Sequence, residues 1–538
     1  MNENGIFWKI FARRSGISFF IIILLFLSCI LRIASISTLN YSAALANTNK
    51  LKITVSKCRG SIYDCNMVPI TNNTKKYIAV VPPDKTALTA LSKVLNENEL
   101  AELEIRLTDK KPVKLELSEK ISVSNIVIAD VYETDKENLP AVHLIGYTDS
   151  DLKGVAGIEK AYDGILSSEK EITVYYDCNA KGEILEGVNP EVNINSSLTE
   201  NAVKTTLDIN LQMIAEEAAL NIERGAIIIC ESETGKIRAM VSMPQFNPQK
   251  TADYLNDSAS PLLNRAINSY NVGSIFKPCV AAAGIENKKG DFSYFCDGKT
   301  EIEDRIFKCH NLEGHKFMNL KTAIANSCNT YFYNYALNIG ADAIYKKASV
   351  LRFGSSIKIC DGITVSKGNL PKVDTINTSS ALANLSIGQG KLLLSPVTML
   401  NLYNAIANEG EYYIPSVIEG TYISGIFNEY NKGYPTKAME KETATLLTDY
   451  LKAVLEEGTG ETAKPTLISA AGKTATAQTG KFENGIEICQ GWFCGFFPAE
   501  NPKYTVIVFS EDTNKQLKTN SEIFSFIADK TANLKKLK

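Results

Sequence analysis

A serine and a lysine three residues apart, Ser274 and Lys277, form the first candidate catalytic pair. They lie in residues 271–278, which read N-V-G-S-I-F-K-P. Gly273 and Pro278 bracket a predicted helix start, since proline is tolerated in the first helical turn. Side chains at this spacing share one helical face, so a lysine whose pKa is lowered by burial can take the serine proton. The pattern predicts a nucleophile activated without histidine, although S-x-x-K by itself recurs by chance in long chains.

Two further motifs follow this pair along the chain. Residues 327–329 read S-C-N, and residues 473–478 read K-T-A-T-A-Q on a strand predicted over residues 467–478. Each motif alone has an ordinary explanation as part of a turn or of a strand. All three in this order, in one chain, indicate a single site.

Together the three motifs resemble S-x-x-K, S-x-N and K-T-G of the penicillin-binding protein and serine β-lactamase superfamily. Four flanking segments narrow the resemblance to class B penicillin-binding proteins. They are residues 59–64 (R-G-S-I-Y-D), 154–159 (G-V-A-G-I-E), 386–390 (S-I-G-Q-G) and 492–496 (W-F-C-G-F). The resemblance covers nearly the whole chain. It implies a peptidoglycan D,D-transpeptidase that cross-links stem peptides, releases the terminal D-alanine and needs no metal or organic cofactor.

The resemblance also implies a role for each motif residue. Ser274 attacks the carbonyl of the penultimate D-alanine, with Lys277 as general base. Ser327 relays a proton to the leaving amine, and Asn329 holds the substrate backbone. The charge of Lys473 keeps Lys277 deprotonated and attracts the substrate carboxylate. That carboxylate is expected on the hydroxyls of Thr474 and Thr476, and the oxyanion on the backbone N–H groups of Ser274 and Thr476.

One residue departs from the family pattern. Ala475 stands where the family usually has glycine, on a strand edge expected to run close to the nucleophile and the bound peptide. The added methyl group puts the reaction rate and the affinity for β-lactams in doubt. It also keeps open a catalytically weak scaffold within a cell-wall synthesis complex.

Enzymes of the same fold are further alternatives, namely a β-lactamase or a D,D-carboxypeptidase. A lactamase would need a base that activates water, such as the glutamate of class A enzymes. The sequence between Asn329 and Lys473 contains no E-x-x-L-N-like segment. The transpeptidase is therefore the favoured prediction.

The elements that must position these residues are predicted from residue 205 onward. Asp208 is expected to cap a helix with apolar residues at positions 211, 214, 218 and 222. Two hairpins are predicted, one from residues 225–230 and 237–243 and one from residues 492–497 and 504–509, and a last helix from residues 521–534. Strands at both ends with helices between them indicate an α+β fold. By resemblance this is an antiparallel sheet flanked by helices, of the β-lactamase/transpeptidase type.

Four regions are predicted along the chain. They are a cytoplasmic tail (1–15), a transmembrane anchor (16–36), a non-catalytic, elongated mixed α/β pedestal or dimerisation domain (37–200), and the transpeptidase domain (201–538). In the pedestal we expect strands at residues 77–81 and 121–128 and a helical stretch at residues 88–107. Polar residues 193–201 suit a linker.

The N-terminal region predicts the compartment. Basic residues between positions 9 and 14 precede an apolar run over residues 17–31. Extended to residue 36, the run reaches the roughly 20 residues that span a bilayer, if Arg32 snorkels. The basic flank places the N-terminus in the cytoplasm and the remainder outside the membrane. A cleaved signal peptide with its site at residues 44–46 is the less favoured alternative.

Several partners follow from the resemblance. They are peptidoglycan stem peptides, β-lactam antibiotics and a membrane glycosyltransferase. Nucleic acid is not expected, because 57 Lys+Arg against 60 Asp+Glu leave a net charge of −3 and phosphate binders need a basic excess.

Cysteine and histidine usage narrows the chemistry further. Three histidines (His143, His310 and His315) would have to supply any Ser-His-Asp or multi-histidine zinc site, and none of the 12 cysteines forms a C-x-x-C pair. Outside the membrane, Cys296 and Cys309 become a candidate disulfide that closes a loop over the cleft, with two free thiols as an equal alternative. Cys328 is expected to be a small packed residue.

Overall fold

The computed structural model describes residues 3–38, 50–123, 126–167, 171–179, 181–185, 188–194, 200–431 and 433–537. The chain forms two compact units. The first comprises residues 1–58, 75–131 and 169–196, and the second comprises residues 59–74, 132–168 and 197–538. The predicted boundary at residue 200 stays a prediction, and the candidate cleavage site at residues 44–46 lies outside the described residues.

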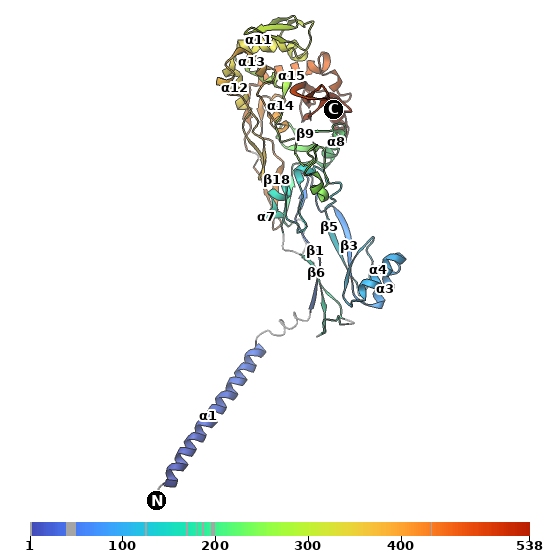
Figure 1. The fold of residues 1–538 in the computed structure, drawn as a ribbon, viewed down its shortest axis with the longest axis vertical. Coiled ribbons are helices and arrows are strands. Elements are labelled where there is room, and N and C mark those ends of the chain that lie inside the picture. Colours follow the sequence, from blue (N-terminus) through green and yellow to red (C-terminus); the bar gives the residue numbers. More distant parts are fainter. Residues whose placement is uncertain are drawn as a thin grey trace. The chain divides into compact units, whose positions relative to one another are not determined.

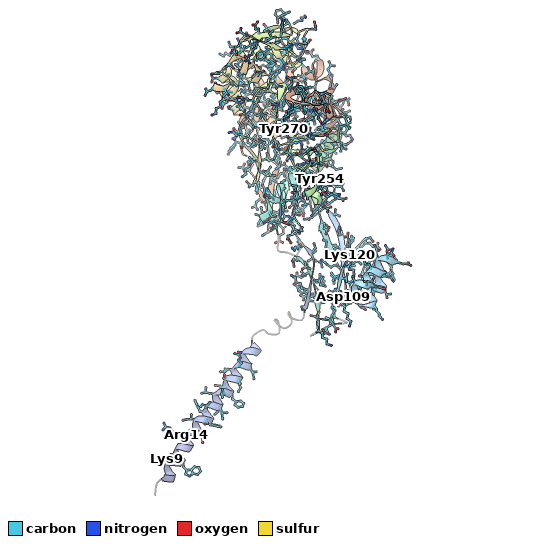
Figure 2. The ribbon with its side chains drawn as sticks, in the orientation of Figure 1. Lys9, Arg14, Asp109, Lys120, Tyr254 and Tyr270 are labelled. Carbon is cyan, nitrogen blue, oxygen red and sulfur yellow. The ribbon has the colours of Figure 1, made fainter. Side chains whose placement is uncertain are left out.

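The first unit begins with a long apolar helix, α1 (Glu3–Thr38). Its segment Ala12–Ser35 is long and apolar enough to cross a membrane. Lys9 and Arg14, labelled in Figure 2, lie on the N-terminal part of this helix.

The rest of the first unit contains two small sheets. One has the order β1 (Lys50–Lys57), β6 (Glu171–Asp177), β7 (Glu191–Ile194), and the other the order β4 (Val113–Leu117), β3 (Thr74–Val81), β5 (Val127–Glu133). The strand predicted over residues 121–128 is wrong in its bounds, because only its last two residues belong to β5. The predicted linker begins inside β7.

The predicted helical stretch of residues 88–107 is two helices, α3 (Lys85–Leu91) and α4 (Glu97–Leu107). Residues 92–96 separate them, and Asn96 caps the start of α4. Its side chain accepts a hydrogen bond from the N–H of Glu99, whose side chain bonds back to the N–H of Asn96. This capping box starts a new helix.

The second unit is built on a five-stranded sheet. Its order is β10 (Ile237–Met243), β9 (Gly225–Glu231), β23 (Tyr504–Ser510), β22 (Ile486–Phe497), β21 (Ala471–Glu483). All four pairings are antiparallel, and Gly225 pairs with Ser510. The two predicted hairpins are confirmed and lie side by side, and β21 forms an edge.

Helices cover both faces of this sheet. Phe493 of β22 stacks on Phe524 of α16 (Asn520–Lys535), with ring centroids 4.4 Å apart. Neighbouring residues of a strand face opposite ways, and Cys494 lies beside Tyr403 of α14 (Pro396–Ala407). The predicted α+β class and last helix are confirmed.

The second unit contains further helices. They are α8 (Ile209–Ala219), α9 (Lys277–Glu286), α10 (Leu320–Ala325), α11 (Asn329–Ile339), α12 (Ala341–Val350), α13 (Ser379–Ser386) and α15 (Lys441–Glu457). Asp208 caps α8 as predicted, but the helix ends at Ala219, before residue 222. Figure 1 shows α11, α12 and α13 grouped at one end of the unit and β18 with α7 at the other.

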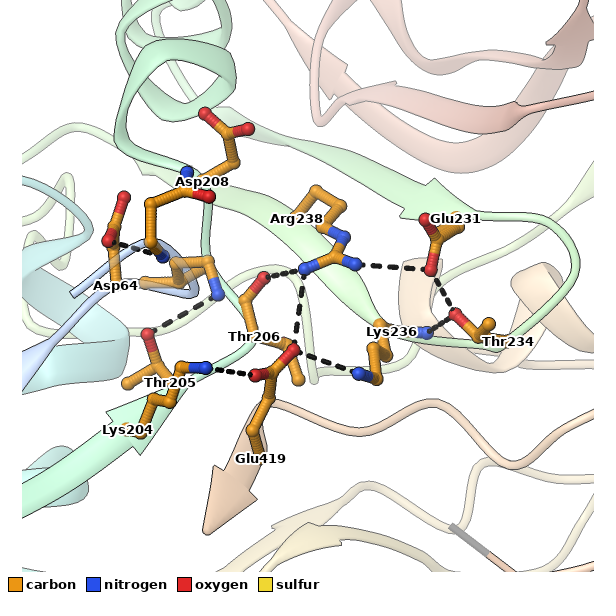
Figure 3. Close-up of polar contacts among 12 residues, drawn as sticks. Asp64, Lys204, Thr205, Thr206, Asp208, Glu231, Thr234, Lys236, Arg238 and Glu419 are labelled. Carbon is orange, nitrogen blue, oxygen red and sulfur yellow. Dashed lines mark hydrogen bonds and ion pairs between the residues drawn. The ribbon is translucent and has the colours of Figure 1, made fainter. Parts of the chain in front are cut away.

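A second sheet of this unit has the order β19 (Ile426–Glu429), β18 (Ile418–Ile423), β8 (Ala202–Thr205), β2 (Ser61–Tyr63). Glu419 on β18 pairs with Lys204 at 3.0 Å and with Lys236 at 2.8 Å, and Arg238 lies 3.7 Å away (Figure 3). Burial alone would raise the pKa of Glu419, but the hydrogen bonds from the two lysines outweigh burial and lower it. The cluster ties this sheet to β10.

Two of the flanking motifs meet in a buried ion pair. Nε of Arg59 donates to Oε2 of Glu159 at 2.7 Å, and Nη1 donates to Oδ1 of Asp163 at 2.8 Å. Glu159 lies on α6 (Gly157–Ala161), and Asp163 begins α7 (Asp163–Leu166). The segments around residues 59–64 and 154–159 are therefore parts of one structural feature.

Candidate functional site

The serine of the first motif lies on a tight turn that leads into a helix. A short 3-10 turn (Gly273–Phe276) carries Ser274 and continues directly into α9 at Lys277. Gly273 has φ +62°, and its N–H donates to the carbonyl of Gly388 at 3.0 Å. A Cβ at Gly388 would lie 2.1 Å from the Gly273 oxygen, so glycine is required there. The segment at residues 386–390 thus supports the turn.

A second support comes from β22. The indole N–H of Trp492 donates to the carbonyl of Asn271 at 2.8 Å, and the N–H of Asn271 donates to Oε1 of Gln490 at 2.9 Å. These bonds fix the chain just before Ser274 to the sheet. Through Trp492, the W-F-C-G-F segment therefore helps to position the turn that carries Ser274.

Lys277 joins the first and second motifs. Its side chain is fully buried. Nζ donates to Oδ1 of Asn329 at 2.8 Å and to the Ser327 carbonyl at 2.6 Å, and lies 3.2 Å from Ser327 Oγ. The amine also lies 5.3 Å from the centroid of the Phe332 ring. The structure thus brings together the two motifs.

The second motif occupies the connection between α10 and α11. Ser327 adopts a left-handed conformation with φ +52°, and Asn329 is the first residue of α11. This turn directs the Ser327 side chain and its carbonyl oxygen toward the same lysine amine. Left-handed backbone is uncommon outside glycine, asparagine and aspartate, so the turn is held by its surroundings.

The third motif lies on the edge strand β21. Lys473 is fully buried, and its Nζ donates to the Thr474 carbonyl at 3.2 Å and to Thr459 Oγ1 at 3.3 Å. The hydroxyls of Thr459 and Thr474 are 2.9 Å apart. Thr459 follows the end of α15 and was not predicted from the sequence. The G-T-G at residues 458–460 is the signal that could have pointed to it.

Burial dominates the electrostatics of the two lysines. It lowers the pKa of Lys277 to about 7. Burial, and secondarily repulsion from Lys277, lowers the pKa of Lys473 well below its usual value. The sequence-based expectation gave Lys473 the charge that keeps Lys277 neutral. In the structure the main cause for Lys277 is its own loss of solvent.

Ala475 lies beside the turn that carries Ser274. A Cβ built on Gly273 would lie 3.4 Å from the Cβ of Ala475 and 3.2 Å from that of Ala477. The methyl group that departs from the family pattern therefore packs against a glycine. The absence of a side chain at Gly273 gives it room.

The three motifs border one cavity of about 550 Å³. Ser274, Ser327, Asn329, Thr474, Ala475 and Thr476 line it. Lys277 and Lys473 are both fully buried, and their amines lie behind the residues that line the cavity. The sequence analysis had named Trp492 in the W-F-C-G-F segment and His310 among the three histidines, but it missed the other lining residues, namely Thr459, Thr462, Gly491, Thr513, Gln516, Thr519, Asn520 and Ser521.

The candidate disulfide is not formed, because Cys296 and Cys309 are both free thiols in this structure. Their sulfurs lie 3.6 Å and 3.5 Å from Nδ1 of His315, so each faces the imidazole. Cys328 is buried and packed as predicted, with its sulfur 4.0 Å from that of Cys309.

The transpeptidase domain family of penicillin-binding proteins matches residues 225–529. The chain belongs to this family. The matched residues contain all three motifs and the whole five-stranded sheet. The resemblance inferred from the motifs is confirmed.

Curated relatives carry transpeptidase and sporulation names. Peptidoglycan D,D-transpeptidase MrdA of Acinetobacter baumannii is 27% identical over 425 residues, covering 72% of this chain and 61% of the relative. Stage V sporulation protein D of Bacillus subtilis is 26% identical over 487 residues, covering 84% and 73%. The chain thus spans less than two thirds of the length of the first of these relatives.

Solved structures share the fold. The D,D-transpeptidase domain of a peptidoglycan glycosyltransferase from Eggerthella lenta has a TM-score of 0.64 at 21% identity, covering 90% of this chain and 100% of that chain. Penicillin-binding protein 3 of Mycobacterium tuberculosis, complexed with ampicillin, has a TM-score of 0.65 at 20% identity, covering 90% and 97%.

Proposed function

We propose that the protein is a peptidoglycan D,D-transpeptidase that acts through a serine acyl-enzyme. The observation that carries the proposal is the placement of Lys277. Its buried amine contacts Ser327 and Asn329 behind the cavity that Ser274 lines. The D,D-transpeptidase names of relatives support the substrate class.

Acylation begins with attack by Oγ of Ser274 on the carbonyl of the penultimate D-alanine. Lys277 takes the hydroxyl proton, since burial lowers the pKa of Lys277 to about 7. The oxyanion is stabilised by the backbone N–H groups of Ser274 and Thr476, each worth a few kcal/mol. The C–N bond then breaks, and the terminal D-alanine leaves with a proton passed from Lys277 through the Ser327 hydroxyl, 3.2 Å away.

Substrate binding changes the protonation of Lys473. A carboxylate held by Thr474 and Thr476 beside the Lys473 ammonium raises the pKa of Lys473, because an opposite charge favours the charged form. The charge then disfavours protonation of Lys277. An amine from a neighbouring stem finally attacks the acyl-enzyme carbonyl, forms the cross-link and releases Ser274.

Labelling with a fluorescent penicillin tests the acyl-enzyme. The native chain should be labelled and Ser274→Ala should not, whereas Ser355→Ala, at an exposed serine outside the cavity, should label as the native chain does. No label on the native chain would overturn the proposal and favour the scaffold. Equal label on Ser274→Ala would assign the nucleophile elsewhere.

A second assay separates transpeptidase from the enzymes of the same fold. With lipid-linked precursor and a polymerase, cross-linked stems are expected. Tetrapeptide without cross-links would identify a D,D-carboxypeptidase. A penicillin label that fades within minutes would identify a β-lactamase, because water would then resolve the acyl-enzyme.

We further propose that α1 anchors the protein with its N-terminus in the cytoplasm and the site outside. The apolar segment Ala12–Ser35 and the basic residues before it support this orientation. A membrane glycosyltransferase is the partner we expect, because cross-linking needs nascent strands. Protease added to intact spheroplasts should digest the second unit, and its protection would refute the orientation.

A further inference from the structure

We propose that Cys296, Cys309, His315 and Cys328 bind one structural zinc ion directly behind the S-x-N motif. Their ligand atoms all lie within 4.8 Å of one another, and the three cysteines are buried. Three thiolates and one imidazole are a common ligand set of structural zinc sites. The inference extends the proposed function without depending on it, because it concerns metal binding.

The measured separations match tetrahedral coordination. Zinc–sulfur bonds of about 2.3 Å and a zinc–nitrogen bond of about 2.05 Å place sulfur about 3.6 Å from nitrogen and about 3.8 Å from another sulfur. Nδ1 of His315 lies 3.6 Å from the sulfur of Cys296 and 3.5 Å from that of Cys309. The sulfurs of Cys309 and Cys328 are 4.0 Å apart. These distances leave room for one ion at the centre.

Three of the four ligands come from a compact loop. Strand β11 (Tyr294–Cys296) pairs with β14 (Lys316–Met318) so that Cys296 lies opposite Lys316, next to His315. Gly314 has φ +77°, and a Cβ there would lie 2.2 Å from the Cys296 carbonyl oxygen. This close approach holds His315 beside Cys296.

Cys309 is fixed by its own backbone bond. It follows β13 (Arg305–Lys308), which pairs with β12 (Lys299–Ile302), and its N–H donates to the Gly298 carbonyl at 2.8 Å. The fold therefore presents three ligands without any zinc-specific spacing in the sequence.

The fourth ligand connects this loop to the catalytic motif. Cys328 lies between Ser327 and Asn329, whose oxygens contact Nζ of Lys277. An ion bound to all four residues would fix the S-x-N turn to the loop. With four protein ligands no coordination position is open to substrate, so the ion positions Ser327 and Asn329 and takes no part in the chemistry.

Charge and packing favour a metal over a disulfide. A disulfide would use two of the three sulfurs and leave the third thiol buried against an imidazole. Zinc binding uses all four groups, with release of the thiol protons. The imidazole of His310, 5.0 Å from that of His315 between ring centroids, borders the ligand set.

Metal analysis of the full chain purified in detergent tests the proposal. After dialysis against a weak chelator, we expect about one zinc per chain. Cys296→Ser, Cys309→Ser and His315→Ala should each lower the content at least about tenfold. Cys360→Ser, at a half-buried thiol outside the cluster, should keep it.

A spectroscopic measurement on the native chain remains decisive if these variants fail to fold. Replacement of zinc by cobalt(II) should give the intense visible bands of a tetrahedral cobalt–thiolate site, and His310→Ala should leave them unchanged. Loss of the cobalt bands in His310→Ala would show that His310 supplies the imidazole ligand in place of His315. A native chain without zinc, without these bands on adding cobalt, and with two thiols lost to a disulfide would overturn the proposal.

Discussion

Oδ1 of Asn329 accepts a hydrogen bond of 2.8 Å from the buried Nζ of Lys277. This contact joins α9, which begins with Lys277, to α11, which begins with Asn329. We predict that Asn329→Ala lowers the rate of penicillin acylation about 10- to 150-fold, the equivalent of about 1.5–3 kcal/mol for a hydrogen bond to a charged group. Asn338→Ala, at an exposed position on the same helix, is the control. Equal rates in the two variants would contradict the prediction.

Acylation should depend on pH through Lys277. Burial lowers the pKa of Lys277 to about 7, so the amine is protonated below that pH and is a competent base above it. The acylation rate should therefore rise about tenfold from about pH 6 to about pH 8. Stopped-flow labelling with a penicillin measures the profile. Lys277→Arg should be inactive throughout, because arginine stays protonated, and a flat profile in the native chain would exclude Lys277 as the base.

Ala475 packs beside the turn that carries Ser274. The Cβ of Ala475 faces Gly273, where an added Cβ would lie 3.4 Å away, so a branched side chain at position 475 would press on the backbone of this turn. Overpacking typically costs about 1–3 kcal/mol, so Ala475→Val should slow acylation about 5- to 150-fold. Ala475→Gly should stay within about threefold of the native rate, because it removes one methyl group and adds no contact. A Val variant as fast as the native chain would show that the methyl group has free space.

The buried ion pair between Arg59 and Glu159 should stabilise the second unit. Arg59→Ala leaves the carboxylate buried without its partner, which costs about 3–5 kcal/mol and lowers Tm by on the order of 10 °C. Lys358→Ala removes an exposed pair with Asp361 and should leave Tm unchanged. Thermal unfolding followed by circular dichroism measures both. Similar Tm values for the two variants would refute the stabilising role.

Local sequence determined the three motifs, the two hairpins, the last helix and the apolar α1, because each depends on neighbouring residues and on the period of side chains along a helix or strand. It also identified Ser274, Lys277 and Lys473 as residues to bring together. It missed Thr459, because nothing local distinguishes a threonine that follows a helix. Only the fold shows that its hydroxyl contacts Lys473 and Thr474.

Only the tertiary structure determined the environment of these residues, namely their burial, their pKa values and the space around them. The pKa of Lys277 depends on burial by residues distant in the chain, and the space for Ala475 depends on Gly273 across the turn. The cysteines show the same limit. Placement outside the membrane made Cys296 and Cys309 a candidate disulfide, with two free thiols as an equal alternative, but strand pairing and the turn at Gly314 bring His315 and Cys328 to the same point. Proximity between distant segments is a property of packing, and no local pattern encodes it.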